Sequence, residues 1–184
     1  MESSSLGLRS NFKSLLRFGP REIALTAVFG SISFALRLSG IAFPFVGIII
    51  GPADFFILSA CIIGGPIVGP LTGIIYAFAS PFPLISAAGT VLAFPLGIYA
   101  RLFHRSKRMV LWWIGYWLVL IFVYCPLETI IVTFIWLGFI PTGSSFLAGF
   151  IAISIAMAVD SVPIMLVLEA LRKANIPYIN DVWQ

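Results

Sequence analysis

The sequence predicts an all-α integral membrane protein: a bundle of six transmembrane helices with both termini in the cytoplasm. Three observations support this prediction. The 184 residues are 60% hydrophobic and 10% charged, and their mean hydropathy is +1.09. The apolar residues form long runs, and a helix needs ~20 such residues to cross a hydrocarbon layer of ~30 Å. The positive charges fall into three clusters between those runs.

The basic clusters set the expected topology, because lysine and arginine in short loops mark the cytoplasmic side of a membrane. If all three clusters lie inside, an even number of crossings separates each pair. About 80 residues separate the first two clusters, room for four compact spans, and about 60 separate the last two, room for two. The clusters are Arg9, Lys13, Arg17 and Arg21; Arg101, Arg105, Lys107 and Arg108; and Arg172 and Lys173.

Three regions follow from this topology. We expect a basic cytoplasmic segment over 1–21, a six-helix membrane domain over 22–174 and a short cytoplasmic tail over 175–184. The net charge of +4 therefore reports orientation in the cell membrane and not a surface for nucleic acid.

The first half of the membrane domain is expected to hold three helices. The first covers 22–38 and is followed over 39–51 by an apolar stretch at the outer surface, for which two interpretations stay open, a loop or a partly re-entrant segment. The second covers 52–63 and starts at Pro52, since proline suits the first turn of a helix. An inner turn over 64–66, rich in glycine and proline, leads to the third helix over 67–79.

The second half begins with an outer turn over 80–83. One helix is expected over 84–103, because membrane helices tolerate breakers such as Gly89 and Pro95. The next covers 110–138 and is so long that it must tilt, bend near Pro126 or extend beyond the hydrocarbon. An outer loop over 138–143 leads to the last helix, which begins near Ser144 or Ser145 and ends near residue 174.

Four ionisable residues fall inside the predicted spans, where such groups are costly and indicate function. From the helical rise of ~1.5 Å, Arg37, Asp54 and Glu128 belong to the outer half and Asp160 to the middle. Structural interpretations are also open: Asp54 complements a helix dipole, Arg37 snorkels to the outer headgroups or pairs with Glu128 or Asp54, and Asp160 bonds backbone freed near Pro163. Glu128 is expected to bind a ligand or to pair with another residue. If their helices are neighbours, an outward-facing polar pocket follows.

Small residues recur along the first predicted helix at Ala24, Ala27, Ser31 and Ala35. The last three are spaced by four residues and share one helix face. Such a stripe lets another helix approach closely. Two interpretations stay open: packing inside the bundle, or docking to another membrane subunit.

Enzyme motifs are missing from the sequence. His104 is the single histidine and falls in a basic loop, so no histidine-based catalytic or metal site is expected inside the membrane. No phosphate-binding loop of the GxxxxGK[ST] type occurs. Cys61 and Cys125 both fall in predicted spans, where we expect buried apolar thiols. We therefore predict no enzyme activity, no metal and no cofactor.

Two stretches resemble the substrate-binding S components of energy-coupling factor (ECF) vitamin transporters. Gly51-Pro52-Ala53-Asp54-Phe55-Phe56 followed by Gly64-Gly65-Pro66-Ile67-Val68-Gly69-Pro70-Leu71-Thr72-Gly73 is similar to the acidic helix and glycine-rich helix of riboflavin- and folate-type members. The start of the first helix at 22–27 and the stretch 158–161 around Asp160 resemble thiamine-type members. The Glu-Tyr pair of thiamine binders is absent, and Thr90 and Val91 lie in that region.

The resemblance implies a subunit that captures a small water-soluble vitamin or related metabolite from outside and delivers it inward. The partners would be a coupling transmembrane subunit, which Ala24, Ala27, Ser31 and Ala35 would face, and two ATPases that supply the energy. The substrate-binding candidates are Arg37, Asp54, Phe82, Thr90, Glu128, Trp136 and Asp160.

Two other classes of function remain open. A scaffold or assembly protein would use its buried acids only for structure. A membrane enzyme acting on lipid would need a nucleophile or metal cluster that the sequence does not contain.

Overall fold

The computed structural model describes residues 16, 18–41, 43–45, 48–103, 109–138, 140 and 142–174. The predicted tail over 175–184, most of the predicted segment over 1–21 and the basic loop at 104–108 lie outside these ranges. Within them the chain is helical apart from one short β-hairpin.

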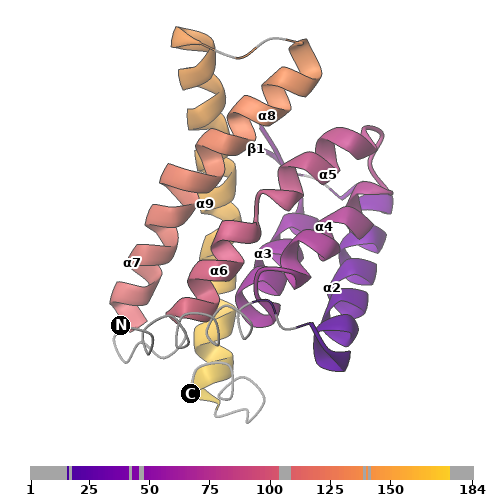
Figure 1. The fold of residues 1–184 in the computed structure, drawn as a ribbon, viewed down its shortest axis with the longest axis vertical. Coiled ribbons are helices and arrows are strands. Elements are labelled where there is room, and N and C mark those ends of the chain that lie inside the picture. Colours follow the sequence, from indigo (N-terminus) through magenta and orange to yellow (C-terminus); the bar gives the residue numbers. More distant parts are fainter. Residues whose placement is uncertain are drawn as a thin grey trace, which may run out of the picture.

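Helices of very different length follow one another along the chain (Figure 1). The two longest columns are α7–α8 and α9, which lie beside each other in Figure 1. The elements are α2 (Pro20–Leu38), β1 (Phe43–Phe45), β2 (Ile48–Ile50), α3 (Pro52–Gly64), α4 (Val68–Ala77), α5 (Pro83–Val91), α6 (Phe94–Leu102), α7 (Met109–Val119), the π-helical segment η1 (Leu120–Tyr124), α8 (Cys125–Leu137) and α9 (Gly143–Lys173).

Three helical segments are long and apolar enough to cross a membrane: Pro83–Leu102, Val110–Ile135 and Gly143–Leu171. The helices Pro52–Gly64 and Val68–Ala77 are apolar but shorter. The membrane character predicted from the sequence is thus supported by three helices of the described chain, whereas a topology of six crossings remains a prediction.

Helix α3 lies at the centre of the packing, since it contacts α2, α4, α6 and α9. The start of α2, the end of α6, the start of α7 and the end of α9 all lie at the lower end of the molecule in Figure 1. Arg21, Arg101 and Lys173 belong to these helix ends. One residue from each predicted basic cluster is therefore found at the same end.

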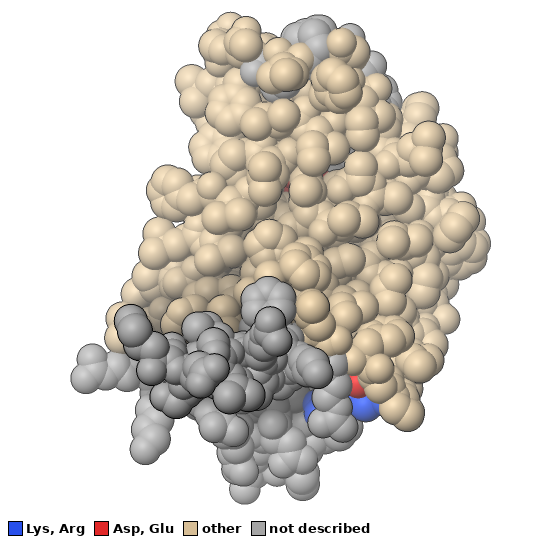
Figure 2. Space-filling view, in the orientation of Figure 1, with Lys and Arg blue, Asp and Glu red and all other residues tan. Residues whose placement is uncertain are grey.

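The surface is apolar where a soluble protein would be polar. Large hydrophobic side chains are exposed on most helices, among them Val28 on α2, Phe122 in η1 and Leu166 on α9. Outside the grey atoms, the face in Figure 2 is almost entirely tan, with blue and red atoms at its lower edge and one small red spot in its upper half. A soluble monomer rarely exposes so extensive an apolar surface, and hydrocarbon is the environment that suits it.

Helix α2 likewise buries polar residues and exposes apolar ones. Its buried residues are Glu22, Thr26, Gly30 and Ser33, while Ile23 and Val28 are exposed. The inward polar groups find local partners: the Thr26 hydroxyl donates to the Glu22 carbonyl at 2.8 Å, and the Ser33 hydroxyl to the Ala53 carbonyl at 3.3 Å.

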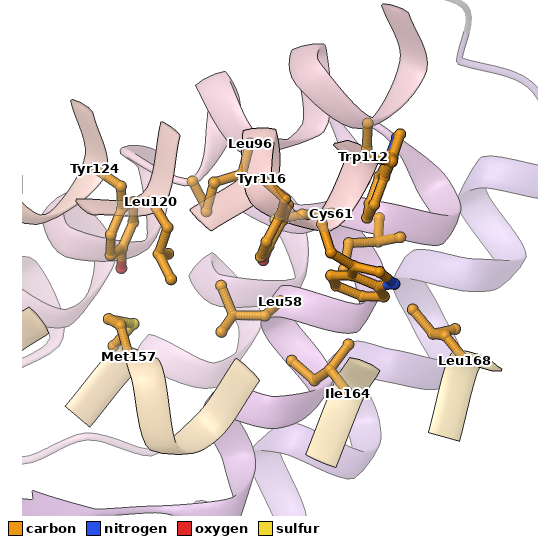
Figure 3. Close-up of a cluster of buried hydrophobic side chains, with 14 of the residues drawn as sticks. Leu58, Cys61, Leu96, Trp112, Tyr116, Leu120, Tyr124, Met157, Ile164 and Leu168 are labelled. Atoms are coloured by element: carbon orange, nitrogen blue, oxygen red, sulfur yellow. The ribbon is translucent and has the colours of Figure 1, made fainter. Parts of the chain in front are cut away.

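The main core lies where α7 and η1 face α3 and α9. Figure 3 shows Tyr116, Leu120 and Tyr124 pointing toward Met157 and Ile164, with Leu58 and Cys61 of α3 between them. The rings of Trp112 and Tyr116 stack, with centroids 5.7 Å apart. Cys61 and Cys125 are buried free thiols, as expected.

Glycines in the motif after α3 allow very close packing. A Cβ at Gly69 would meet the sulfur of Cys61, and one at Gly73 would meet Thr90 of α5. On α6, a Cβ at Gly97 would come within 2.6 Å of the backbone of the turn at residues 65–66. These contacts hold α3, α4, α5 and α6 together more tightly than larger residues would allow.

The apolar stretch predicted at the outer surface over 39–51 contains an antiparallel hairpin. Phe43 pairs with Ile50, and Phe45 pairs with Ile48. Backbone polar groups in apolar surroundings need hydrogen-bond partners, and pairing two extended segments supplies them. Neither a loop nor a re-entrant segment, the two interpretations from the sequence, included this strand pairing.

The helix predicted over 84–103 is found as one apolar helical segment, Pro83–Leu102, with a local distortion at Leu92 and Ala93 between α5 and α6. Pro95 lies in the first turn of α6 and has no N–H for the carbonyl of Val91, so the hydrogen-bond ladder stops there. The helix over 110–138 is irregular directly before Pro126, where the Cys125 N–H donates to the Leu120 carbonyl across a wider π-type turn.

Candidate functional site

Charged and phenolic side chains from six elements come together inside the apolar bundle. We call this group the polar cluster; it consists of Arg37 (α2), Asp54 (α3), Tyr76 (α4), Tyr124 (η1), Glu128 (α8) and Asp160 (α9). Asp54 is its centre, since it lies within electrostatic reach of Arg37, Glu128 and Asp160. The ionisable groups that the sequence analysis selected on separate helices are therefore neighbours.

Asp54 is held in place by the start of α3. Gly51 is extended and Pro52 occupies the first turn, as predicted, and the Asp54 N–H donates to the Gly51 carbonyl at 3.1 Å. The side chain is half-buried. β2 ends at Ile50 and contacts α9, so the hairpin connects α9 to the beginning of the helix that carries Asp54.

Glu128 lies between α8 and α5. Its Oε1 is 3.2 Å from the position that a Cβ would take at Gly89, so the absence of a side chain there makes room for the carboxylate. Glu128 also has a side-chain hydrogen-bond interaction with Tyr124. Among the described residues its Oε2 atom is buried without a hydrogen-bond partner.

Asp160 is the most enclosed acid of the polar cluster, with 6% of its surface exposed. It lies between Met157 and Ile164 on the face of α9 that packs against α3, since spacings of three and four residues share one helix face. Its Oδ2 atom finds no hydrogen-bond partner within the described part of the chain.

Arg37 supplies positive charge to the polar cluster. Its guanidinium carbon lies 5.5 Å from the centroid of the Tyr76 ring, a cation–π distance. Both Arg37 and Asp54 are described, and they form no direct ion pair. The guanidinium therefore acts on Asp54 through space, which corrects the simple structural bridge considered from the sequence.

The polar cluster has more acids than bases. Within the described ranges it contains three carboxyl groups and one guanidinium, which acts on Asp54. A buried carboxylate without a partner costs several kcal/mol, so the excess must be offset by protons or by a bound group. A carboxylate that lacks a partner and persists in an apolar bundle points to a role in binding.

Three other residues were predicted for the site. Two of them lie outside the polar cluster, and the side chain of the third is not among those described. Thr90 packs against Gly73 of α4, and its hydroxyl donates to the Ala87 carbonyl at 3.0 Å, so it serves helix packing. Phe82 lies directly before α5, is 51% exposed and lines a shallow surface hollow with Ile135. The side chain of Trp136 is outside the described residues.

The four small residues of α2 are all exposed: Ala24, Ala27, Ser31 and Ala35. They lie opposite the face that packs on α3 and α4. Packing inside this bundle, one of the two interpretations from the sequence, therefore does not account for the stripe.

Sequence reasoning missed the two tyrosines of the polar cluster and an ion pair at the opposite end. Tyr76 and Tyr124 are each buried, but hydropathy gives no signal that separates such tyrosines from ordinary membrane aromatics. At the basic end, Arg101 Nη2 lies 3.2 Å from both Glu22 Oε1 and the Gly64 carbonyl. The acid in the first turn of α2 was the available signal for that pair.

The described residues hold no group of three His, Cys, Asp or Glu side chains close enough to bind a metal ion. Comparisons with protein-family models, curated proteins and solved structures gave no match for this chain.

Proposed function

We propose that this chain is the membrane-embedded substrate-capture subunit of an ECF-type importer. It binds a small water-soluble vitamin or related metabolite from outside and delivers it inward. The observation that carries the proposal is the polar cluster, in which acids from α3, α8 and α9 meet inside an apolar bundle with two buried oxygens unpaired in the described chain.

The proposal includes six crossings of the cell membrane with both termini inside. The gathering of Arg21, Arg101 and Lys173 at one end supports it, because basic residues favour the cytoplasmic side. The polar cluster lies away from that end, beside the hairpin and the first turn of α3, which fits a site that is loaded from outside.

Energy would come from partners, because the sequence has no phosphate-binding loop. The exposed face of α2 with Ala24, Ala27, Ser31 and Ala35 suits close docking of a helix from a coupling subunit. Two ATPase subunits would drive that subunit. The chain itself then needs no catalytic group.

The test is mass spectrometry of small molecules that co-purify with the protein in detergent. Wild-type protein is expected to retain one, and Asp160→Asn to lose it while keeping its fold. Glu169→Gln is the matched control, since it removes an acid of α9 outside the polar cluster. Equal retention by all three proteins, or no bound molecule in any of them, would argue for a scaffold.

A further inference from the structure

The charge balance of the polar cluster carries an inference about the kind of molecule that it binds. In the described chain Asp54 interacts electrostatically with the guanidinium of Arg37, and the carboxyl groups of Glu128 and Asp160 each interact with Asp54. An anionic ligand would add negative charge to a group that already has an excess. A ligand with positive charge would instead offset the cost of the buried acids.

A second observation, independent of the number of acids, points to a ligand. Asp160 is more than nine-tenths buried, and its Oδ2 has no partner among the described residues. It faces α3 between two core residues, Met157 and Ile164. This acceptor lies in the packed interior and interacts electrostatically with Asp54.

The arrangement of the acids favours an organic cation over a metal ion. In the described chain no three ligating side chains converge on one point. Separate carboxylates match several N–H donors distributed over a planar group, as in an amidinium or guanidinium, which bonds carboxylates at more than one site.

The aromatic residues favour the same class of ligand. Tyr76 already has a guanidinium against its ring at 5.5 Å, which shows that this environment accommodates a delocalised cation. Tyr124 lies beside Glu128, so an aromatic ring and a carboxylate are adjacent there as well.

We propose that the polar cluster recognises a planar organic cation, with Glu128 and Asp160 accepting its N–H groups and Asp54 between them. This rests on the proposed capture function and specifies its substrate class. Arg37 balances one acid, which leaves the others for the ligand.

The test uses three probes of one shape and different charge: benzamidinium, benzamide and benzoate. Their binding to the full chain in detergent, after removal of co-purifying molecules, is measured by calorimetry. Benzamidinium is expected to bind at least about tenfold more tightly than benzamide, with benzoate weakest. Asp160→Asn and Glu128→Gln should each weaken benzamidinium by about 30-fold, because each removes one partner of a buried charge pair, and Glu169→Gln should not.

One further variant is expected to strengthen the binding of benzamidinium, a result that misfolding cannot produce. Arg37→Gln removes the internal cation, so benzamidinium should bind more tightly to it than to the wild type. Benzoate or benzamide binding as well as benzamidinium, or no binding of any probe, overturns the inference. A neutral or anionic molecule co-purifying with the protein would also overturn it, yet would leave substrate capture intact.

Discussion

The ion pair between Arg101 and Glu22 gives the sharpest test of how the basic end is held together. Arg101→Met keeps much of the side-chain volume and removes the charge. In the wild type, Arg101 Nη2 joins the first turn of α2 to the Gly64 carbonyl at the end of α3, at 3.2 Å in both contacts. The variant separates three elements that meet at this point.

The expected cost follows from burial. The Arg101 side chain is 23% exposed and that of Glu22 is 9% exposed. Exposed ion pairs contribute about 0–1 kcal/mol, and loss of one partner of a buried pair costs about 3–5 kcal/mol. This partly buried pair lies between the two, and we expect a loss of about 2 kcal/mol. For a chain of this size that corresponds to a fall in Tm of about 4–8 °C.

The assay is thermal unfolding in detergent followed by tryptophan fluorescence, which reports the core through the buried Trp112 and Trp113. Lys173→Met is the control, since it removes a positive charge at the same end from an exposed residue. A double-mutant cycle with Glu22→Gln isolates the pair and should give a coupling energy of about 1–2 kcal/mol.

The reasoning would be refuted by equal Tm values for Arg101→Met and Lys173→Met. A coupling energy near zero in the cycle would refute it as well. Either result would mean that Glu22 is satisfied without Arg101, for example by the Gly19 N–H, which donates to its Oε2 at 2.9 Å.

Three further predictions concern the core. Tyr116→Phe should raise the stability by about 1 kcal/mol, since the buried hydroxyl has no partner among the described residues; a lower Tm would contradict this. Gly69→Ala should cost about 1–3 kcal/mol by overpacking against Cys61, and Cys61→Ala should recover part of that loss in the double variant; strictly additive losses would exclude the contact. Gly97→Ala meets backbone that cannot rotate away, so it should lower Tm more than Gly69→Ala does; the reverse order would be contrary to the packing described.

Local chemistry explains what could be predicted from the sequence. Pro52 marks a helix start because proline fixes φ in a first turn. Asp54, Glu128 and Asp160 could be selected because charge in an apolar run is costly wherever it falls. These inferences need no knowledge of which helices touch.

The rest depends on contacts between distant segments. Tyr76 and Tyr124 join the polar cluster through the packing of α4 and η1, which hydropathy does not encode. Thr90 looked polar enough to bind a ligand, yet the close approach at Gly73 turns it toward α4. The distortion before Pro95 was open to local reasoning, and the expectation that the span tolerates this proline agrees with the apolar helical segment Pro83–Leu102.

The wide turn formed by Leu120–Tyr124 determines where the acid beyond it points. Inward residues recur every four positions from Trp112 to Tyr124, and in a regular helix each such step overshoots a full rotation by about 40°. The additional residue in the π-helical turn reduces this overshoot. The inward-facing residues of α7 and α8 therefore stay on the same side of the helix. Deleting a single residue between positions 120 and 124 would rotate Glu128 by about 100° around the axis, away from Asp54 and into the lipid.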